Sequence, residues 1–362
     1  MWLTRVQHRL NIECGGLASR LLSRSLAAFR DFSGLPLALF AHGVYDQAPA
    51  NPRRFPTKNF MPVRELRAEV EWLHRRGYRF IGFGELLRYL RREADAPARA
   101  VHLMFDDGYR SIYEHAFPAL QQLDVPFSVA LVETFVRQGR LLWFDDLHCR
   151  IQTGSERIRE INRLAPDVLR VDAFDATACR VVYGMNRLKL VADTRRREIL
   201  DAISTLCPLE ESSVSEYFRP LDDEQIREMR NRGIVFLAHS RSHPILSSIE
   251  GANSLRDEVT NWDPQMLEPG CLVIPDGKAT ELSPRVASAL RDAGTAFAFS
   301  TMSGFIDRDA SPLGLNRVSM QGGLKDLRAR LATVELDHLR SLKSHPHRGQ
   351  SPDAGFEANR HP

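Results

Sequence analysis

Short apolar runs alternate with amphipathic stretches from residue 35 onward. The run LPLALFA at 35–41 is continuously apolar, as expected of a buried strand, whereas apolar residues recur every three or four positions in 62–77, as in a helix. Gly77 ends that helical pattern. The same criteria predict strands at 35–41, 78–83, 98–105, 125–132, 234–238, 271–274 and 295–300, with a further apolar segment at 315–320. They predict helices at about 62–77, 85–92, 111–123, 222–233, 283–294 and 322–342.

This alternation predicts mostly parallel strands with helices outside them, in a doubly wound sheet or a barrel. At least seven strand candidates, with polar residues at their C-terminal ends, favour an α/β barrel of irregular (β/α) type, whose C-terminal face carries the chemistry. The rhythm breaks at about 140–220, which is rich in Arg, Asp and Glu and is predicted to be a helical insertion. The main domain spans 33–342, and the polar, Pro- and Gly-containing tail 343–362 is predicted to be disordered.

Composition narrows the function classes. The 362 residues are 43% hydrophobic, enough for a large core, and the formal net charge of +3 argues against a dedicated nucleic-acid binder. Five scattered cysteines without CxxC spacing argue against a disulfide framework or a cysteine zinc site and favour a reducing compartment.

The segment 1–32 predicts an amphipathic basic helix, with five arginines and one acid in its first thirty residues. It resembles neither a signal peptide nor a membrane span, so a cytoplasmic location is expected. Peripheral contact with the inner membrane surface and packing on the domain exterior both remain open for this helix.

The letters Phe-Asp-Asp occur twice, in MFDDGYRS at 104–111 and in WFDDLHCR at 143–150. In the first copy an apolar strand runs directly into Asp106, Asp107 and Gly108. Carboxylates beyond a strand end indicate a polar pocket, and Gly108 permits a tight turn that aims the two side chains differently. Asp-Gly is also common in ordinary turns, so this motif alone leaves both interpretations open.

Imidazoles follow two other predicted strands. His239 and His243, in HSRSHP, are spaced i and i+4 and would lie on one face of a helical turn, close enough to share a cation. His42 follows LPLALFA, and a lone histidine there is more often structural than catalytic. One carboxylate and two imidazoles would form a three-ligand divalent-metal site, with a second carboxylate as base and another imidazole as acid. That set predicts metal-assisted hydrolysis of an amide or ester.

Three segments in order resemble motifs of the polysaccharide deacetylase (NodB-homology) family of carbohydrate esterases. MFDDGYRS resembles the family's TFDDG segment, HSRSHP its H-(S/T)-x-x-H-P metal motif, and IPDG its Y-P-x-G segment with the helix and strand that follow. The match covers roughly 35–145 and 220–320. LPLALFAHGV resembles the L-M-Y-H-x-V start of the subgroup with a circularly permuted motif order.

The resemblance implies a role for each matching residue. Asp106 would be the general base and His42 the general acid. Asp107, His239 and His243 would bind one divalent metal ion, zinc in the first place, with cobalt or nickel as alternatives. Tyr109, Trp143, Pro275 and Asp276 would contact the substrate. The family fold is an irregular (β/α) barrel, which would make 33–342 a catalytic domain, and the usual substrates are N-acetylated sugars.

The sequence departs from the family pattern at several positions. Ile274 replaces the tyrosine before Pro-x-Gly, Asp276 occupies the variable position, and Ala41 replaces the tyrosine of M-Y-H. The arginine that many members place in the Pro-x-Gly motif, paired with the base, is absent from it. The metal-ligand positions are intact.

The second Phe-Asp-Asp allows two interpretations. Asp146, His148 and Cys149 could form a second metal site. Alternatively, the aromatic residues anchor the insertion, and Asp145 or Asp146 caps the next helix. The second interpretation is favoured because no glycine turn or matching distant motif accompanies these residues.

The leading hypothesis is removal of N-acetyl groups from an N-acetylhexosamine unit of a polysaccharide precursor, glycolipid or glycoconjugate. The alternatives are a carbohydrate O-acetyl esterase, which depends less on His42, and a catalytically impaired carbohydrate-binding relic, suggested by Ile274.

Overall fold

The architecture centres on one curved parallel sheet. The computed structural model describes residues 34–47, 59–169, 186–210, 214 and 216–344. The helix predicted in 1–32 and all but the first two residues of the tail 343–362 lie outside the described residues, as does 170–185 within the predicted insertion.

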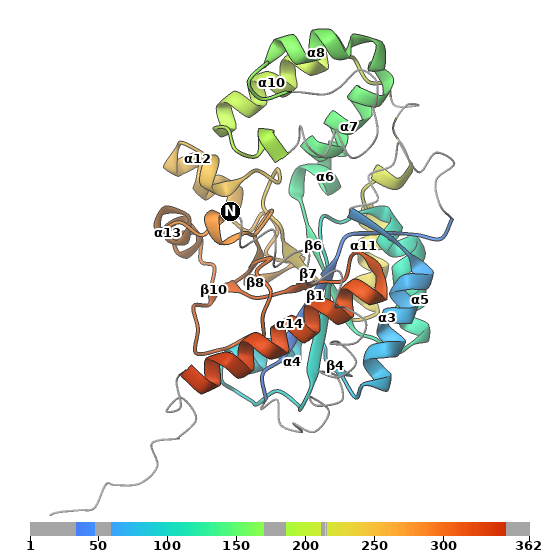
Figure 1. Cartoon of the computed structure of the whole chain (residues 1–362), viewed down its shortest axis with the longest axis vertical. Helices are drawn as coiled ribbons and strands as arrows, with labels where there is room; N and C mark the ends of the chain where they lie inside the picture. Colours follow the sequence, from blue (N-terminus) through green and yellow to red (C-terminus); the bar gives the residue numbers. More distant parts are fainter. Residues whose placement is uncertain (1–33, 48–58, 170–185, 211–213, 215, 345–362) are drawn as a thin grey trace, which may run out of the picture.

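Nine strands of the described chain form this sheet, and every pair that they make is parallel. Their bounds are β1 (Leu37–Ala41), β4 (Arg79–Phe80), β5 (Ala100–Phe105), β6 (Phe127–Leu131), β7 (Val235–Ala238), β8 (Leu267–Val273), β9 (Phe297–Phe299), β10 (Leu313–Leu315) and β11 (Val318–Ser319). The order is β10-β9-β8-β7-β6-β5-β1-β11, with β4 beside the start of β5. The sheet curls into a half-barrel (Figure 1).

The register brings the predicted site residues to one edge of the sheet. Ala41 pairs with Phe105, so His42 and Asp106 leave their strands at the same level. Leu131 pairs with Ala238, which brings His239 to that level from β7. Every residue of β1, β5 and β6 is buried, as expected for strands covered on both faces of a parallel sheet, and their two polar residues, His102 and Ser128, hydrogen-bond to each other.

Helices cover the outside of the sheet, and their apolar faces account for their positions. Leu66, Val70 and Leu73 of α3 are fully buried at the predicted helical spacing. The outer helices are α3 (Val63–Arg75), α4 (Phe83–Leu90), α5 (Phe117–Gln122), α11 (Asp223–Asn231), α12 (Ala252–Val259), α13 (Pro284–Asp292) and α14 (Gly323–Ser344). The long helix α14 lies across the molecule and contacts α3 (Figure 1).

The predicted insertion contains three described helices of substantial length. They are α7 (Trp143–Thr153), α8 (Ile158–Leu164) and α10 (Asp193–Leu206), and they follow the short helix α6 (Glu133–Gln138). In Figure 1 they gather into a lobe at the top, beyond the end of the sheet where α6 follows β6. The insertion therefore stands over the edge where the polar residues meet.

The prediction of an irregular α/β barrel with mainly parallel strands is confirmed. Local details differ. The strand predicted at 78–83 is reduced to the two residues of β4, and the helix predicted at 111–123 begins with a π-helical turn, Ile112–Ala116. Two short strands that were not predicted, β2 (Gly43–Tyr45) and β3 (Phe60–Pro62), form a separate parallel pair.

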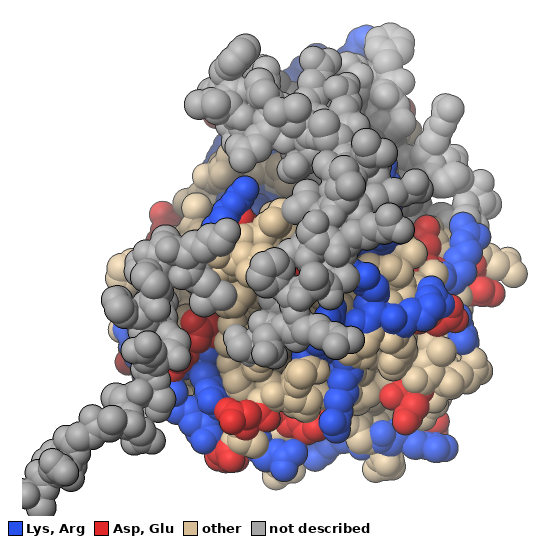
Figure 2. Space-filling model, turned by 60° about the horizontal axis from the view of Figure 1, so that its bottom comes forward, with Lys and Arg blue, Asp and Glu red and all other residues tan. Residues whose placement is uncertain are grey.

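The exposed surface carries charges of both signs. On the face in Figure 2, basic and acidic side chains are interspersed over the described residues, in keeping with the near balance of the composition. Within the described ranges, the helices are too short or too polar to cross a bilayer.

Candidate metal centre

Asp107, His239 and His243 converge beyond the carboxyl ends of β5 and β7, the two neighbours of β6. The Nε2 atoms of His239 and His243 lie 3.5 and 3.4 Å from Oδ1 of Asp107. One ligand atom from each residue lies within 4.8 Å of the others. The structure thus brings together the three residues predicted as ligands, in a set that leaves coordination positions for water and substrate.

The buried surroundings of the Asp107 carboxylate suit a bound cation. Its side chain is 0% exposed, and among the described residues neither carboxylate oxygen has a hydrogen-bond partner. Burial raises the pKa of Asp107, but the interaction with His239 and the nearby imidazoles outweighs burial and holds that pKa below its usual value. An ionised, buried carboxylate without hydrogen-bond donors is costly, and a bound cation would remove that cost.

His239 is held in the tautomer that a metal ligand needs. Its Nδ1 lies 2.8 Å from the carbonyl oxygen of Val273. Because a carbonyl can only accept, Nδ1 carries the hydrogen and Nε2 presents its lone pair toward Asp107.

Backbone strain is concentrated around these ligands. Seven non-glycine residues of the described chain have positive φ, and four of them belong to this site: Asp107, Ser240, His243 and Asp276. Such conformations are unfavourable for L-residues and persist where their surroundings fix them. The prediction that His239 and His243 share a helical turn is wrong, because φ is 65° at Ser240 and 55° at His243. A left-handed loop, not a helix, directs both imidazoles to Asp107.

Gly108 allows the two neighbouring acids to diverge, as predicted. Its φ is 89°, and a Cβ there would lie 2.7 Å from Cδ2 of Leu131. A side chain at this position is therefore excluded by the positive φ and by the contact with Leu131.

Asp106 forms a bidentate ion pair with Arg317. Nη1 and Nη2 of the arginine donate to Oδ1 and Oδ2 at 2.7 and 2.9 Å, and Nε donates to the carbonyl oxygen of Ser300 at 2.8 Å. Arg317 is 0% exposed and Asp106 is 2% exposed. Burial raises the pKa of Asp106, but Arg317 together with the nearby His239 and His42 outweighs burial and holds that pKa below its usual value. Asp106 is therefore a fixed carboxylate that can accept a proton.

Arg317 is a site residue that the sequence analysis missed. No arginine stands in the Pro-x-Gly motif, and the partner of Asp106 comes instead from LNRVSM, 211 residues along the chain. The available signal was one arginine in the segment LNRVSM, which follows the predicted strands. Because β11 pairs with β1, the side chain of Arg317 comes within reach of Asp106 only in the folded sheet.

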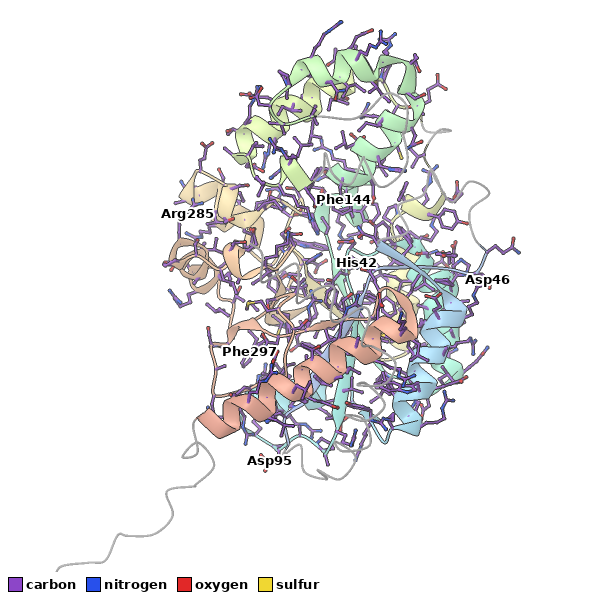
Figure 3. All side chains as sticks on the ribbon, viewed as in Figure 1. His42, Asp46, Asp95, Phe144, Arg285 and Phe297 are labelled. Carbon is purple, nitrogen blue, oxygen red and sulfur yellow. The ribbon has the colours of Figure 1, made fainter. Side chains whose placement is uncertain are left out.

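His42 lies at the same edge and lines the same pocket as Asp106 and Asp107. Its Nδ1 is 3.1 Å from Nε2 of Gln321, and its ring meets Phe40 edge-on. Burial is the main influence on this imidazole and lowers its pKa from the ordinary value. In Figure 3, His42 lies near the middle of the molecule, below Phe144 and the insertion.

A pocket of about 240 Å³ opens at this edge. Its wall includes the metal-ligand candidates Asp107, His239 and His243, together with Asp106 and His42. Ile274 and Asp276 line it from the loop after β8, and Asn186 and Lys189 line it from the insertion. The insertion therefore supplies part of the substrate cleft.

The second Phe-Asp-Asp also contributes to the site. Asp145 lines the pocket, is 2% exposed, and accepts a hydrogen bond of 2.6 Å from the hydroxyl of Tyr109. Burial raises its pKa well above the usual value, which favours the neutral form of this carboxyl group. The expected helix cap is wrong: α7 begins at Trp143 without a side-chain cap, and Asp146 pairs with Arg150 instead. The alternative second metal site finds no support among the described residues, where only one cluster has metal-ligand geometry.

The four predicted substrate contacts occupy different surroundings. Only Asp276 lines the pocket; Tyr109 is 0% exposed beneath it and Pro275 is buried. Trp143 donates a hydrogen bond of 3.1 Å from its indole nitrogen to the carbonyl oxygen of His243. In this conformation Tyr109 and Trp143 support site residues, Asp145 and His243 respectively.

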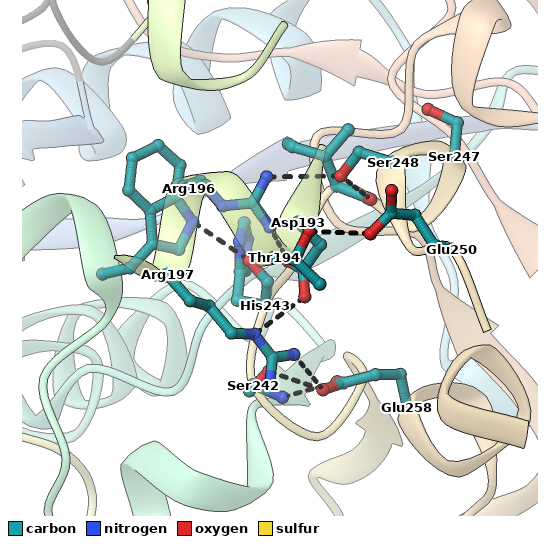
Figure 4. Close-up of polar contacts among 12 residues, drawn as sticks. Asp193, Thr194, Arg196, Arg197, Ser242, His243, Ser247, Ser248, Glu250 and Glu258 are labelled. Carbon is teal, nitrogen blue, oxygen red and sulfur yellow. Dashed lines mark hydrogen bonds and ion pairs between the residues drawn. The ribbon is translucent and has the colours of Figure 1, made fainter. Parts of the chain in front are cut away.

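A polar network ties the insertion to the metal-ligand loop (Figure 4). Glu258 of α12 accepts hydrogen bonds from the backbone nitrogen and hydroxyl of Ser242 at 2.9 and 2.6 Å. Asp193 of α10 pairs with Arg196 and Arg197, and Arg197 also reaches Glu258 at 3.9 Å. Helix α10 is thereby linked to the loop that carries His243.

Comparison with known proteins finds N-deacetylases of N-acetylglucosamine polymers among similar sequences. Over 102 residues the chain is 34% identical to the poly-beta-1,6-N-acetyl-D-glucosamine N-deacetylase of Escherichia coli K12, a match covering 28% of this chain and 14% of that protein. The protein of the same name from Staphylococcus epidermidis is 27% identical over 73 residues, 20% of this chain and 25% of that protein. The matched stretches thus span a quarter or less of these relatives. No protein-family model matches the sequence.

Solved structures share the fold at low sequence identity. The deacetylase PplD of Streptococcus pyogenes, solved with acetate, is 15% identical and aligns with a TM-score of 0.52 over 83% of this chain and 97% of its own. A de-N-acetylase from Aggregatibacter actinomycetemcomitans is 15% identical, with a TM-score of 0.51 over 82% and 99%. These comparisons confirm the resemblance to polysaccharide deacetylases, while the circularly permuted subgroup stays a prediction.

Proposed function

We propose that this chain is a metal-dependent hydrolase that releases acetate from an N-acetylhexosamine unit. One observation carries the proposal: Asp107, His239 and His243 converge in the same pocket as a buried carboxylate, Asp106, and an imidazole, His42. The sequence relatives are named for N-deacetylation of a polymer of N-acetylglucosamine. Cytoplasmic location and contact with a membrane remain predictions.

We propose zinc as the metal, with cobalt or nickel as substitutes. Two imidazole nitrogens and one carboxylate oxygen suit these borderline cations better than calcium or magnesium, which prefer oxygen ligands. When bound, such a metal polarises the substrate carbonyl group and makes water more acidic.

The residues of the chain divide the proton transfers between them. Asp106 accepts a proton from the water that attacks the amide carbon, and Arg317 fixes the direction of its oxygens. His42 donates a proton to the amide nitrogen as the carbon–nitrogen bond breaks, so that the amine leaves neutral. The products are acetate and a free amino sugar. The hydrogen bond that His239 donates to the carbonyl oxygen of Val273 and the polar network around Ser242 hold the metal ligands in place.

The experiment that tests this proposal combines metal analysis with acetate release. Purified protein is loaded with zinc, cobalt or nickel and given N-acetylglucosamine oligomers and N-acetylated glycolipids. Wild type should hold about one metal ion per chain and release acetate. Asp106→Asn should retain the metal and lose on the order of 10²- to 10⁴-fold in rate, as expected for loss of a general base.

Asp146→Asn is the matched control. It removes an acid from the other Phe-Asp-Asp, where Asp146 forms a partly exposed ion pair with Arg150. Its rate should stay near that of wild type. Equal acetate release by wild type and Asp106→Asn would show that the base is assigned wrongly. Protein that binds no metal and releases no acetate would favour a non-catalytic, carbohydrate-binding role.

A further inference from the structure

Two lysines meet one carboxylate at the rim of the pocket. Nζ of Lys189 lies 2.5 Å from Oδ1 of Asp276, and Nζ of Lys278 lies 2.8 Å from Oδ2. Lys189 comes from the insertion and Lys278 from the loop after β8, and all three residues line the pocket. Each carboxylate oxygen is thus occupied by a different ammonium group, and one positive charge remains in excess.

The loop that carries Asp276 and Lys278 is fixed in place. Asp276 has a φ of 58°, and its carbonyl oxygen accepts a hydrogen bond of 2.7 Å from the hydroxyl of Thr301. A Cβ at Gly277 would lie 2.8 Å from the backbone nitrogen of Thr301, so the two segments are in close contact. A strained, tightly held loop of this kind orients its charged groups before any ligand arrives.

The remaining charges of the pocket do not offset this excess. Asp106 is neutralised by Arg317, and the buried Asp145 accepts a hydrogen bond from the hydroxyl of Tyr109. With a divalent cation at Asp107, the pocket lining is positive overall. An ammonium group has three hydrogen-bond donors, and within the described chain Asp276 is the one hydrogen-bond partner found for Lys189 and Lys278. Donors remain for a ligand.

From this arrangement we propose that the substrate carries an anionic group, namely a phosphate on the carbon next to the acetamido carbon, bound by Lys189 and Lys278. In a 2-acetamido sugar the anomeric carbon is one of the two such neighbours, and it is the one that we propose bears the phosphate. Lys189 and the metal-ligand candidate His243 line the same pocket. A phosphate held there would therefore lie beside the reacting amide. This inference rests on the proposed deacetylase function and specifies its substrate as a glycosyl phosphate or diphosphate.

Asp276 then has a positioning role. Burial raises its pKa, but Lys189 and Lys278 outweigh burial and bring that pKa to about 2, so its carboxylate stays ionised and holds both ammonium groups at the rim. The side chains of Lys189 and Asp276 are 23% and 12% exposed, which limits the screening of their charges by solvent.

The test compares substrates that differ only in the anion. Metal-loaded protein is assayed for acetate release from methyl N-acetylglucosaminide, N-acetylglucosamine 1-phosphate, UDP-N-acetylglucosamine and a short-chain polyprenyl diphosphate N-acetylglucosamine. Wild type should prefer the phosphorylated sugars by at least about tenfold in kcat/KM, the effect of one well-placed charge interaction. The last two substrates distinguish a nucleotide from a lipid as the source of the diphosphate.

Lys189→Met and Lys278→Met should each reduce this preference, and the double variant should abolish it. Added sodium chloride should lower the preference of wild type because screening weakens charge interactions. Arg75→Met is the matched control, since Arg75 lies at the C-terminal end of α3, forms an exposed pair with Glu71, and is not part of the pocket. It removes the same charge and should leave the preference intact.

Two failures are distinguishable. Equal kcat/KM on neutral and phosphorylated sugars in wild type and the lysine variants would overturn the anion site and leave the deacetylase proposal standing. Absence of acetate from every substrate would overturn the deacetylase proposal. In that event calorimetric binding of N-acetylglucosamine 1-phosphate decides the anion site. Tighter binding by wild type than by the double variant supports it, and equal binding overturns it.

Discussion

At the scale of single residues, the pair of Asp106 and Arg317 shows how a buried charge can be both costly and useful. Both groups are almost fully buried, and each satisfies the other through two hydrogen bonds. Replacing both by apolar groups need not destabilise a protein, but removing one partner leaves the other charge buried and unpaired. The pair therefore fixes the orientation of the proposed base more than it contributes net stability.

We expect Arg317→Met to lower the free energy of unfolding by about 3–5 kcal/mol, because it leaves the Asp106 carboxylate buried without its partner. Adding Asp106→Asn should restore much of that loss, since the remaining side chain is neutral. Urea denaturation of the two single variants and the double variant measures the coupling. Strictly additive losses would contradict the ion pair.

His42 provides a prediction that separates amide from ester hydrolysis. His42→Ala should reduce acetate release from an N-acetyl substrate by roughly 10²- to 10⁴-fold, because the amine needs a proton to leave. An O-acetyl sugar should be far less affected, since an alkoxide is a better leaving group than an amide anion. His74→Ala, an exposed histidine on α3, serves as the control. Similar losses on both substrates would argue against His42 as the proton donor.

Sequence reasoning at this scale succeeded where the signal was local. Asp106, Asp107, His239 and His42 each follow a continuous apolar strand, and parallel strands bring such residues to one edge. Arg317 was missed because its partnership depends on the pairing of β11 with β1, which no local pattern encodes.

At the scale of elements, α3 and α14 pack together around a buried acid. Glu69 of α3 is 0% exposed, and neither of its carboxylate oxygens has a hydrogen-bond partner among the described residues. Burial raises its pKa to about 8, so the folded protein keeps the proton at pH values where the unfolded chain has released it. Stability should therefore fall as the pH rises from the unfolded value of about 4.5 toward 8.

We expect Glu69→Gln to remove this decrease in the free energy of unfolding. In wild type the decrease amounts to about 1.4 kcal/mol for each pH unit between the unfolded and folded pKa values of Glu69. Urea denaturation at pH 5.5 and 7.5 checks it. Glu71→Gln is the control, because Glu71 lies on the same helix but is exposed in a pair with Arg75. If wild type and Glu69→Gln show the same change in unfolding free energy between the two pH values, Glu69 is not the group responsible.

The loop from His239 to His243 depends on elements outside the sheet. Glu258 of α12 holds Ser242 through two hydrogen bonds, and Trp143 of α7 holds the carbonyl oxygen of His243. The sequence predicted a helical turn here from the i, i+4 spacing of the two histidines. That spacing does not distinguish a helical turn from the left-handed loop that the structure has. The left-handed backbone at Ser240 and His243 is imposed by these distant contacts, so a local pattern could not indicate it.

Glu258→Gln should weaken metal binding by about 10- to 100-fold, the usual effect of disturbing groups that orient metal ligands. Asp257→Asn on the exposed side of the same helix should leave the affinity unchanged. Competition with a chromogenic chelator measures the metal affinity, and circular dichroism verifies that both variants are folded. Equal affinities for the two variants would mean that the loop is held without Glu258.

At the scale of the whole molecule, the parallel sheet collects polar groups from segments far apart in sequence. The ligands come from the ends of β5 and β7, the base partner from the start of β11, and part of the pocket wall from the insertion. The strand positions, their mostly parallel arrangement and the shared polar edge were predictable, because apolar periodicity and the alternation of strands with helices indicate them. The contribution of the insertion was not, since Asn186 and Lys189 reach the pocket only through the packing of α10 against α7 and α8.

Because the ligands come from different strands, metal binding should stabilise the fold as a unit. A free metal concentration a hundred times the dissociation constant should add about 2.7 kcal/mol to the free energy of unfolding, and a chelator should remove it. Asp107→Asn should lose this increment. Thermal unfolding of both proteins, with zinc and with chelator, measures the four values. The comparison uses the gain that zinc produces in each protein, so any effect of the substitution on the metal-free fold cancels. An equal gain in wild type and in Asp107→Asn would mean that Asp107 is not a metal ligand.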